Sequence, residues 1–150
     1  MDRSVFDIAN WFLTKEAMTP KKLQKLVYYY FAWGQALLKR DMIKNCRFEA
    51  WVHGPVNKTL YNRYKKYGGT NIPKASETVE LSDVEEELLE SVWLTYGDKS
   101  ANELEALTHL EKPWREARQG CGEYEPCAKE ISKKTMRDFY LGIYSGGQGE

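Results

Sequence analysis

Two histidines are the residues of this chain best suited to proton transfer. A hydrolase or transferase needs a nucleophile or an acid–base pair within hydrogen-bonding reach, and His53 and His109 are the two imidazoles present. His53 directly precedes Gly54-Pro55, which indicates a turn, and His109 stands where a helix is expected to end and where an imidazolium complements the helix dipole. We expect a structural role for both, so the sequence predicts no enzyme. A histidine-based hydrolase or transferase is the rival interpretation, and it requires a pocket that joins one histidine to a carboxylate.

The three cysteines, Cys46, Cys121 and Cys127, match no familiar metal or redox motif. Five residues separate Cys121 from Cys127, which is wider than the usual spacing of about two to four in zinc knuckles. An odd number of cysteines does not suit a disulfide framework, so we expect reduced thiols. The sequence also lacks a phosphate-binding Gly-rich loop and a Cys-x-x-Cys pair. We therefore expect no metal and no cofactor.

The charges of the chain sum to zero but are unevenly distributed. Residues 1–75 hold 14 Lys and Arg against 5 Asp and Glu, whereas residues 76–150 hold 8 against 17. One interpretation is that the two oppositely charged halves pack together. The other is a basic surface for an acidic partner or nucleic acid, which would involve Lys21, Lys22, Lys25, Lys58, Arg63, Lys65 and Lys66. Because a dedicated DNA-binding domain is usually basic overall, we favour the first interpretation.

The length and composition fit one compact domain. The chain has 150 residues, of which 42% are hydrophobic and 13% aromatic, enough for one sizeable core. It contains no apolar run of about 18 residues or more, and its acidic N-terminus does not resemble a signal peptide. We therefore expect a cytoplasmic protein that does not enter a membrane.

The element most able to position the other residues is a long helix that follows Thr19-Pro20. Thr19 suits the N-cap and Pro20 the first helical position. The apolar residues between Leu23 and Leu38 cover an arc of about 160° at helical spacing, which is typical of a central helix. Gly34 lies within this arc and predicts the close approach of a crossing helix.

A strand, a turn and a second helix are expected next. Residues 47–52 alternate between polar and apolar side chains, as a strand does. Gly54-Pro55 interrupts the strand, and Pro55 or Val56 is expected to open a helix that ends at Gly68-Gly69. Lys25 and Glu49 could then pair across the central helix and the strand.

Further helices are predicted from capping residues. Ser4 with Asp7, Ser82 with Glu85 and Ser100 with Glu103 have the spacing of capping boxes, Pro113 starts a short turn of helix, and Ser132 caps a last one. Residues 69–80 form a loop that Ile72 tethers, and residues 145–150 form a disordered tail. The fold class is thus mainly α, a single domain over residues 1–144 with six or seven helices around the aromatic central helix. At most one short strand or hairpin precedes the Gly-Pro turn.

Three separated motifs resemble a known family, the Panacea antitoxin domain, also described as SocA-like or GepA-like and common in prophages. The motifs are KLQKLVYY at residues 22–29, EAWVHGPV at 49–56 with Leu60-Tyr61, and a third with Ser100 to Leu104, Leu107-Thr108-His109 and Pro113-Trp114. Their order and spacing over residues 5–144 make the likeness specific. His53 departs from the pattern, because the family more often has tyrosine before Gly-Pro-Val.

The resemblance implies a mainly helical antitoxin that neutralises a cognate toxin by direct binding. The toxin is usually encoded by an adjacent gene, and some family members present it to a protease as adaptors. Tyrosine and tryptophan are also the residue types that anchor protein interfaces. We expect the partner at Lys25, Tyr28, Tyr29, His53, Gly54, Pro55, Val56, Tyr61 and Tyr64. A nucleic-acid-binding regulator that uses the basic N-terminal half is the alternative.

Overall fold

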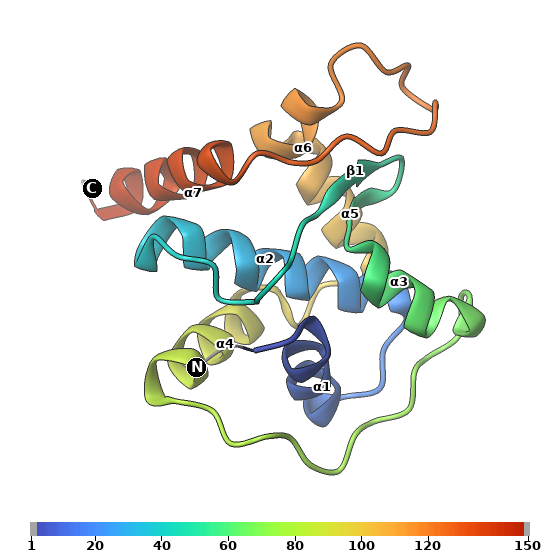
Figure 1. Cartoon of the computed structure of the whole chain (residues 1–150), viewed down its shortest axis with the longest axis vertical. Coiled ribbons are helices and arrows are strands. Elements are labelled where there is room, and N and C mark those ends of the chain that lie inside the picture. The colour runs from blue at the N-terminus through green and yellow to red at the C-terminus, as the bar shows by residue number, and fades with distance from the viewer. Residues whose placement is uncertain (1–2, 149–150) are drawn as a thin grey trace.

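The helix predicted after Thr19-Pro20 lies at the centre of the computed structural model, which describes residues 3–148 and the side chains of residues 3–146 (Figure 1). Seven α-helices and one small antiparallel hairpin make up this part of the chain, which confirms the mainly α fold class. The elements are α1 (Val5–Lys15), α2 (Pro20–Leu38), β1 (Glu49–Trp51), β2 (Gly54–Val56), α3 (Lys58–Tyr64), the 3₁₀ turn η1 (Lys65–Tyr67), α4 (Asp83–Tyr96), α5 (Ala101–Leu110), α6 (Lys112–Ala117) and α7 (Lys133–Gln148).

The predicted helix starts are confirmed by their capping hydrogen bonds. The side chains of Ser4, Thr19, Ser82 and Ser100 each accept the backbone N–H of the residue three positions on. The three serine caps are complete capping boxes, in which Asp7, Glu85 and Glu103 accept the N–H of the cap residue in return. Ser132 likewise accepts the N–H of Thr135 at the start of α7. Local sequence therefore determines where most of the helices begin.

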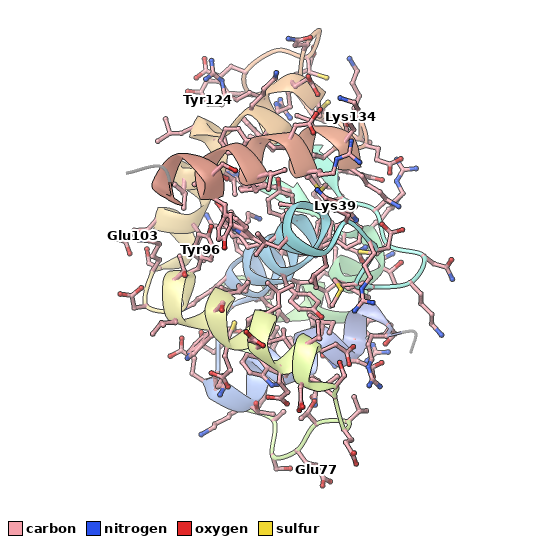
Figure 2. The ribbon with its side chains drawn as sticks, turned by 90° about the vertical axis from the view of Figure 1, so that its left-hand side faces the viewer. Lys39, Glu77, Tyr96, Glu103, Tyr124 and Lys134 are labelled. Carbon is pink, nitrogen blue, oxygen red and sulfur yellow. The ribbon has the colours of Figure 1, made fainter. Side chains whose placement is uncertain are left out.

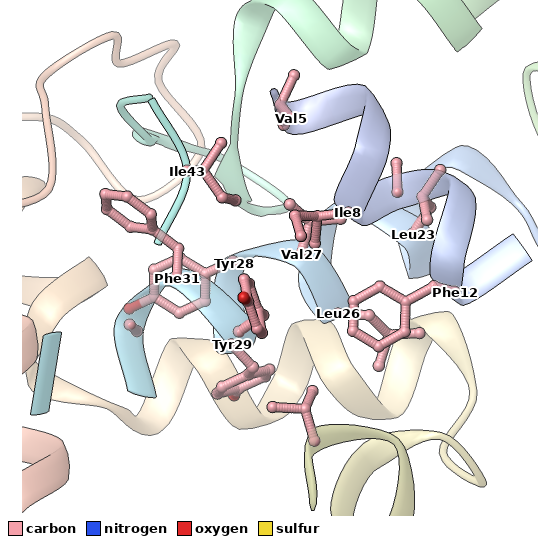
Figure 3. Packing of buried hydrophobic residues seen from close by; sticks show 14 of the residues in the cluster. Val5, Ile8, Phe12, Leu23, Leu26, Val27, Tyr28, Tyr29, Phe31 and Ile43 are labelled. Atoms are coloured by element: carbon pink, nitrogen blue, oxygen red, sulfur yellow. The ribbon is translucent and has the colours of Figure 1, made fainter. Parts of the chain in front are cut away.

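Helix α2 is more deeply buried than its apolar arc predicts. Thirteen of its nineteen residues are buried, because α1, α4, α5, α7 and β2 pack against it from several sides. Figure 3 shows side chains of α2 among those of α1 in the shared interior. At Gly34 the close neighbour is a loop residue and not the predicted crossing helix: a Cβ there would lie 2.5 Å from Cγ of Met42 in the following loop, whereas Cδ2 of Leu88 in α4 would be at an ordinary contact distance of 3.7 Å.

The region around Gly54-Pro55 differs from the prediction in one respect. Residues Gly54–Val56 form the second strand of the hairpin, with Ala50 opposite Pro55 and Trp51 opposite Gly54. Helix α3 therefore begins only at Lys58, and not at Pro55 or Val56. The reason is Asn57, whose Oδ1 accepts the N–H of Leu60 at 2.9 Å and so caps the helix.

The connection between α6 and α7 runs along the other side of β1. The N–H of Ala50 donates to the carbonyl of Lys129 at 3.0 Å, and the N–H of Ile131 donates to the carbonyl of Phe48 at 2.8 Å. Strand β1 is thus paired on both edges. This pairing brings residues 118–131 beside the hairpin, although they are distant from it in sequence (Figure 1).

Ile72 tethers the long loop before α4, as predicted. It exchanges two backbone hydrogen bonds with Met18, of 2.7 and 3.3 Å, and it is buried. At the other end of the chain, α7 is helical as far as Gln148, four residues into the segment 145–150 for which we predict disorder. Residues 149 and 150 lie outside the described residues, and the disorder of this tail stays a prediction. Within residues 3–148, no helix is both long enough and apolar enough to cross a membrane.

Candidate functional site

Lys25 is buried against the hairpin and does not pair with Glu49. Its Nζ donates to the carbonyl oxygen of Pro55 at 3.2 Å, whereas the Glu49 carboxylate accepts from Nε1 of Trp51 at 2.8 Å. Our expected Lys25–Glu49 pair is therefore wrong. Burial, assisted by the charge of nearby Lys21, lowers the pKa of Lys25 to about 7, and the charge of Glu105 opposes this only in part.

Gly54 is required where it stands for two reasons. Its φ of 109° lies in a region that other residues rarely adopt. A Cβ at this position would also lie 2.4 Å from Cε of Lys25. The Gly-Pro-Val motif thus accommodates the buried lysine from the second turn of α2.

A chain of buried hydroxyl groups joins α2 to α7 and to the start of α6. The hydroxyl groups of Tyr28 and Tyr140 lie 3.1 Å apart, and those of Tyr140 and Tyr29 both donate to Oε1 of Glu111, at 2.7 and 2.9 Å. Burial raises the pKa of Glu111 to about 7, and the two tyrosine hydrogen bonds offset only part of this effect. The ring of Tyr29 also stacks on that of Tyr96, with centroids 3.9 Å apart.

Lys25, Tyr28 and Tyr29 therefore belong to the interior, with relative exposures of 1% or less. We expected this side of α2 to face a partner, and the structure shows that it is not a surface. The helical-arc argument failed because it assumed that only one side of α2 is covered, so that Lys25 and Tyr28, outside the apolar arc, would face a partner. Both side chains have long apolar stems that are buried easily once their polar ends have a partner.

His53 is exposed at the tip of the hairpin and is held by Glu105 of α5. The imidazole Nδ1 lies 3.0 Å from Oε2 of Glu105, and the His53 side chain is 71% exposed. Lys21 of α2 pairs with the other carboxylate oxygen. Burial alone would raise the pKa of Glu105, but hydrogen bonds from Lys21 and His53 outweigh it and keep the pKa below its ordinary value. The hairpin tip is thus fixed to both α2 and α5 through one carboxylate.

His109 takes a more specific structural role than a helix-end charge. Its ring stacks on Trp114 of α6, with centroids 4.0 Å apart and an interplanar angle of 15°. Its Nε2 is covered and has no hydrogen-bond partner among the described residues, although Oε2 of Glu105 lies 4.0 Å away. Burial lowers the pKa of His109 despite the nearby Glu105 charge. Nε1 of Trp114 in turn donates to the carbonyl of Trp51 at 2.8 Å, which connects this stack to the hairpin.

A groove of about 490 Å³ opens beside the hairpin tip. We call it the hairpin groove; its lining residues are Glu49, Trp51, Val52, His53, Val56, Lys58, Pro126, Cys127 and Ala128. Trp51 and Tyr61 pack edge to face behind it, with ring centroids 4.9 Å apart. The groove is largely apolar, and Glu49, His53 and Lys58 supply its charged or polar groups.

Positive charge continues from Lys58 of this groove along α3 and η1. We call Lys58, Arg63, Lys65 and Lys66 the basic strip; all four are exposed, and none of them takes part in an ion pair among the described residues. Tyr64 lies on the same element and packs against Tyr67 at 6.3 Å. Many other basic groups of the first half do pair with carboxylates of the second half: Arg3 with Glu85, Lys15 with Glu90 and Lys21 with Glu105. Part of the charge asymmetry thus joins the two halves, and the basic strip belongs to the part left exposed and unpaired, together with Lys39, Arg40, Lys44 and Lys74.

Comparison with known proteins places the three motifs in one family. The sequence model of the family described as "Antitoxin SocA-like, Panacea domain" matches residues 23–115. The chain belongs to this family. Antitoxin SocA from Caulobacter vibrioides (strain NA1000 / CB15N) is 29% identical over 151 residues, an alignment that covers 87% of this chain and 79% of that protein. No solved structure is detectably similar to the chain.

The part of the chain that matches the Panacea domain contains the hairpin tip and all of the buried network except Tyr140 of α7. It includes Lys25, Glu111 and His53, but it ends before the residues 126–128 that form one wall of the hairpin groove. The other residues that we expected to contact a partner divide between the two environments. Gly54, Pro55 and Val56 are buried in β2, Tyr61 is 37% exposed, and Tyr64 is half-buried.

Three residues of this Panacea domain that hold the site together were not singled out from the sequence. Gln24 brackets the backbone of Asn57 with two hydrogen bonds of 2.9 Å, and Glu105 and Glu111 organise the histidines and the tyrosines. A signal existed for Glu105, which precedes His109 by four residues on one helix face. The residues next to Gln24 and Glu111 in the sequence do not indicate their roles, because their hydrogen-bond partners are distant in the sequence.

The enzyme rival required a histidine joined to a carboxylate, and the structure contains such a pair in His53 and Glu105. The carboxylate is, however, shared with Lys21, and Glu105 does not line the hairpin groove into which His53 opens. Among residues 3–148, no group of three or more His, Cys, Asp or Glu side chains could hold a metal ion. The pair therefore accounts for how the hairpin tip is held.

Proposed function

We propose that this protein is an antitoxin that neutralises a cognate toxin by binding it directly, through the hairpin groove and the adjoining basic strip. The observation that carries the proposal is an apolar groove beside unpaired positive charge in a member of the Antitoxin SocA-like family. The toxin is expected to be the product of an adjacent gene, and both proteins to act in the cytoplasm of a host that carries a prophage.

The chemistry of the surface indicates what the toxin presents. Val52, Val56 and Pro126 offer an apolar site with Trp51 behind it, and such a site binds one or two large apolar side chains. The basic strip, which begins at Lys58 in the groove, adds positive charge that forms no ion pair among the described residues. A segment with an apolar anchor flanked by Asp or Glu is therefore the complementary partner.

Co-expression tests the proposal. The neighbouring gene product should arrest growth when it is expressed alone, and the wild-type protein should restore growth. Val52→Asp places a charge in the hairpin groove and should abolish the rescue. Leu94→Asp changes a residue of α4 that is 85% exposed and lies outside the groove, so it should rescue like wild type. A harmless neighbour, or full rescue by Val52→Asp, would contradict the proposal.

Delivery of the toxin to a protease is the more specific form of this proposal. An adaptor lowers the amount of toxin in the cell, whereas simple occlusion leaves the amount unchanged and only blocks activity. The half-life of the toxin, measured with and without this protein, separates the two. A shortened half-life that Val52→Asp restores would support an adaptor that captures its cargo in the hairpin groove.

The exposed basic strip also favours one alternative, a nucleic-acid-binding regulator. Such binding neutralises phosphates and releases counterions, so its affinity falls steeply as salt is raised. Titration of a DNA duplex at low and at physiological salt tests it. Absence of binding at low salt would remove this alternative and leave the acidic toxin surface as the partner of the strip.

A further inference from the structure

The loop between α6 and α7 brings two thiols into contact. Sγ of Cys121 lies 2.6 Å from Sγ of Cys127, with Cys121 as the donor. A disulfide bond is about 2.05 Å long, so only a small movement separates these thiols from a covalent bond. The third thiol, Cys46, is buried like Cys127, but it lies in the core far from both in sequence, and burial raises its pKa to about 12.

Arg118 holds this loop in the shape that brings the thiols together. Its guanidinium group, which is buried, donates to the carbonyls of Gly122 at 2.8 Å and Glu125 at 2.6 Å from one nitrogen and to the carbonyl of Ala50 at 2.8 Å from another. The loop is thereby wrapped around a positive charge and attached to β1. Tyr124 at its outer end is 81% exposed (Figure 2), so the closed shape does not depend on a covering element.

We propose that Cys121 and Cys127 are a reversible dithiol–disulfide pair whose oxidation locks the loop that forms one wall of the hairpin groove. Pro126, Cys127 and Ala128 line that groove. Cys127 is 7% exposed there, and Cys121 is half-buried. The consequence for partner binding rests on the proposed function, whereas the formation of the disulfide does not.

The two thiols are suited to different steps of the reaction. Burial would raise the pKa of Cys127, but the hydrogen bond from Cys121, the N–H of Lys129 and the charges of Arg118 and Lys129 together lower it. The pKa of Cys121 is raised, chiefly because its thiol donates to Cys127. Cys127 also lines the groove through which a small disulfide can approach. It is therefore the nucleophile and Cys121 the resolving thiol, since the thiolate is the attacking species.

The oxidant is a small disulfide of the glutathione class. The Cys127 thiolate attacks one sulfur of this disulfide, forms a mixed disulfide and expels one small thiolate, which takes up a proton. Cys121 then loses its proton and attacks the Cys127 sulfur, and the second small thiol leaves. Two protein thiols have lost two hydrogens in total, and one small disulfide has been reduced to two thiols.

Mass spectrometry tests the pair on the purified full chain. After incubation of the reduced protein with glutathione disulfide, the intact mass should fall by two hydrogens, and alkylation under denaturing conditions should label one cysteine, Cys46, instead of three. Glu123 and Glu125 lie between the paired cysteines. After digestion with a protease that cleaves at Glu, the two cysteine peptides should stay joined until they are reduced.

Serine variants assign the two roles. Cys121→Ser should retain one glutathione on Cys127, because the resolving thiol is missing, whereas Cys46→Ser should form the disulfide like wild type. Three labelled cysteines after oxidation, or separate glutathione adducts on both loop cysteines in the wild type, would overturn the pair.

Affinity for the toxin tests the effect on the groove. The oxidised and reduced forms should differ at least threefold in dissociation constant. Equal affinities would overturn the effect on the groove. If neither form binds the toxin, the proposed function fails, and the mass measurement still decides the disulfide separately.

Discussion

The interior around α2 and the hairpin tip come from the same family motifs, yet they place similar residues in opposite environments. Tyr28 and Tyr29 are sealed in a hydrogen-bonded network with Glu111, whereas His53 and Lys58 are exposed beside an apolar groove. The hydroxyl groups of Tyr28 and Tyr29 form their hydrogen bonds with residues that are distant in the sequence. The comparison teaches that residues of this domain divide into those sealed in the interior and those left at the surface, where we propose that the partner binds.

Gly54 connects the two regions, and its substitution should have the largest effect. Gly54→Ala forces a side chain into a positive φ and against Lys25, which should lower the free energy of unfolding by about 3 kcal/mol. Urea unfolding measures the change. Gly68 is the matched control, because it has a φ of 54° with nothing within 4 Å of an added Cβ, so Gly68→Ala should cost only its backbone strain, about 1–2 kcal/mol. Equal losses would show that Lys25 does not restrict the site.

Glu111 should give the interior a pH dependence of its own. Its folded pKa of about 7 lies above the ordinary value of 4.5, so the folded state holds a proton that the unfolded state has lost. Stability should therefore fall as pH rises from 4.5 to 7, by up to about 3 kcal/mol. Glu111→Gln keeps the shape without the titration. The difference between wild-type and variant unfolding free energies should show this slope, and a constant difference across the window would contradict the buried carboxylate.

Lys25 should give a slope of the opposite sign at higher pH. Its folded pKa of about 7 lies below the ordinary 10.5, so above pH 7 the unfolded state binds the proton that the folded state has released. Stability should rise by about 1.5 kcal/mol from pH 7 to 8.5. Lys25→Met should lack this rise in denaturant titrations. If wild type and Lys25→Met respond to pH alike, the lysine is solvated and the interior is less closed than described.

The basic strip should show the smallest effect on the fold. Reversing Lys65 and Lys66 to Glu leaves Arg63 in place over the ring of Phe6 and should change the free energy of unfolding by less than about 0.5 kcal/mol. Association with an acidic toxin should slow about tenfold at low salt, and the difference should shrink as salt is raised. Stopped-flow experiments at two salt concentrations measure the association rate and its dependence on salt. An unchanged rate would place the toxin away from the strip.

The sequence predicts what depends on neighbouring residues. The caps at Ser4, Thr19, Ser82 and Ser100 are confirmed because each uses an N–H three residues away. The burial of Tyr28 could not be predicted in this way, since its hydroxyl partner, Tyr140, is 112 residues distant. The hairpin groove was likewise hidden, because one wall comes from residues 126–128 and reaches β1 only through tertiary hydrogen bonds.

The most direct test of the division between interior and hairpin compares two purified variants. For each variant, titration calorimetry measures the affinity for the toxin, and urea unfolding measures the stability. Val52→Asp should weaken binding at least a hundredfold, about 2.7 kcal/mol, with little change in stability. Tyr28→Phe removes a buried hydroxyl and should lose about 1 kcal/mol of stability with an unchanged affinity. The opposite result, in which Tyr28→Phe loses affinity and Val52→Asp binds like wild type, would contradict the account.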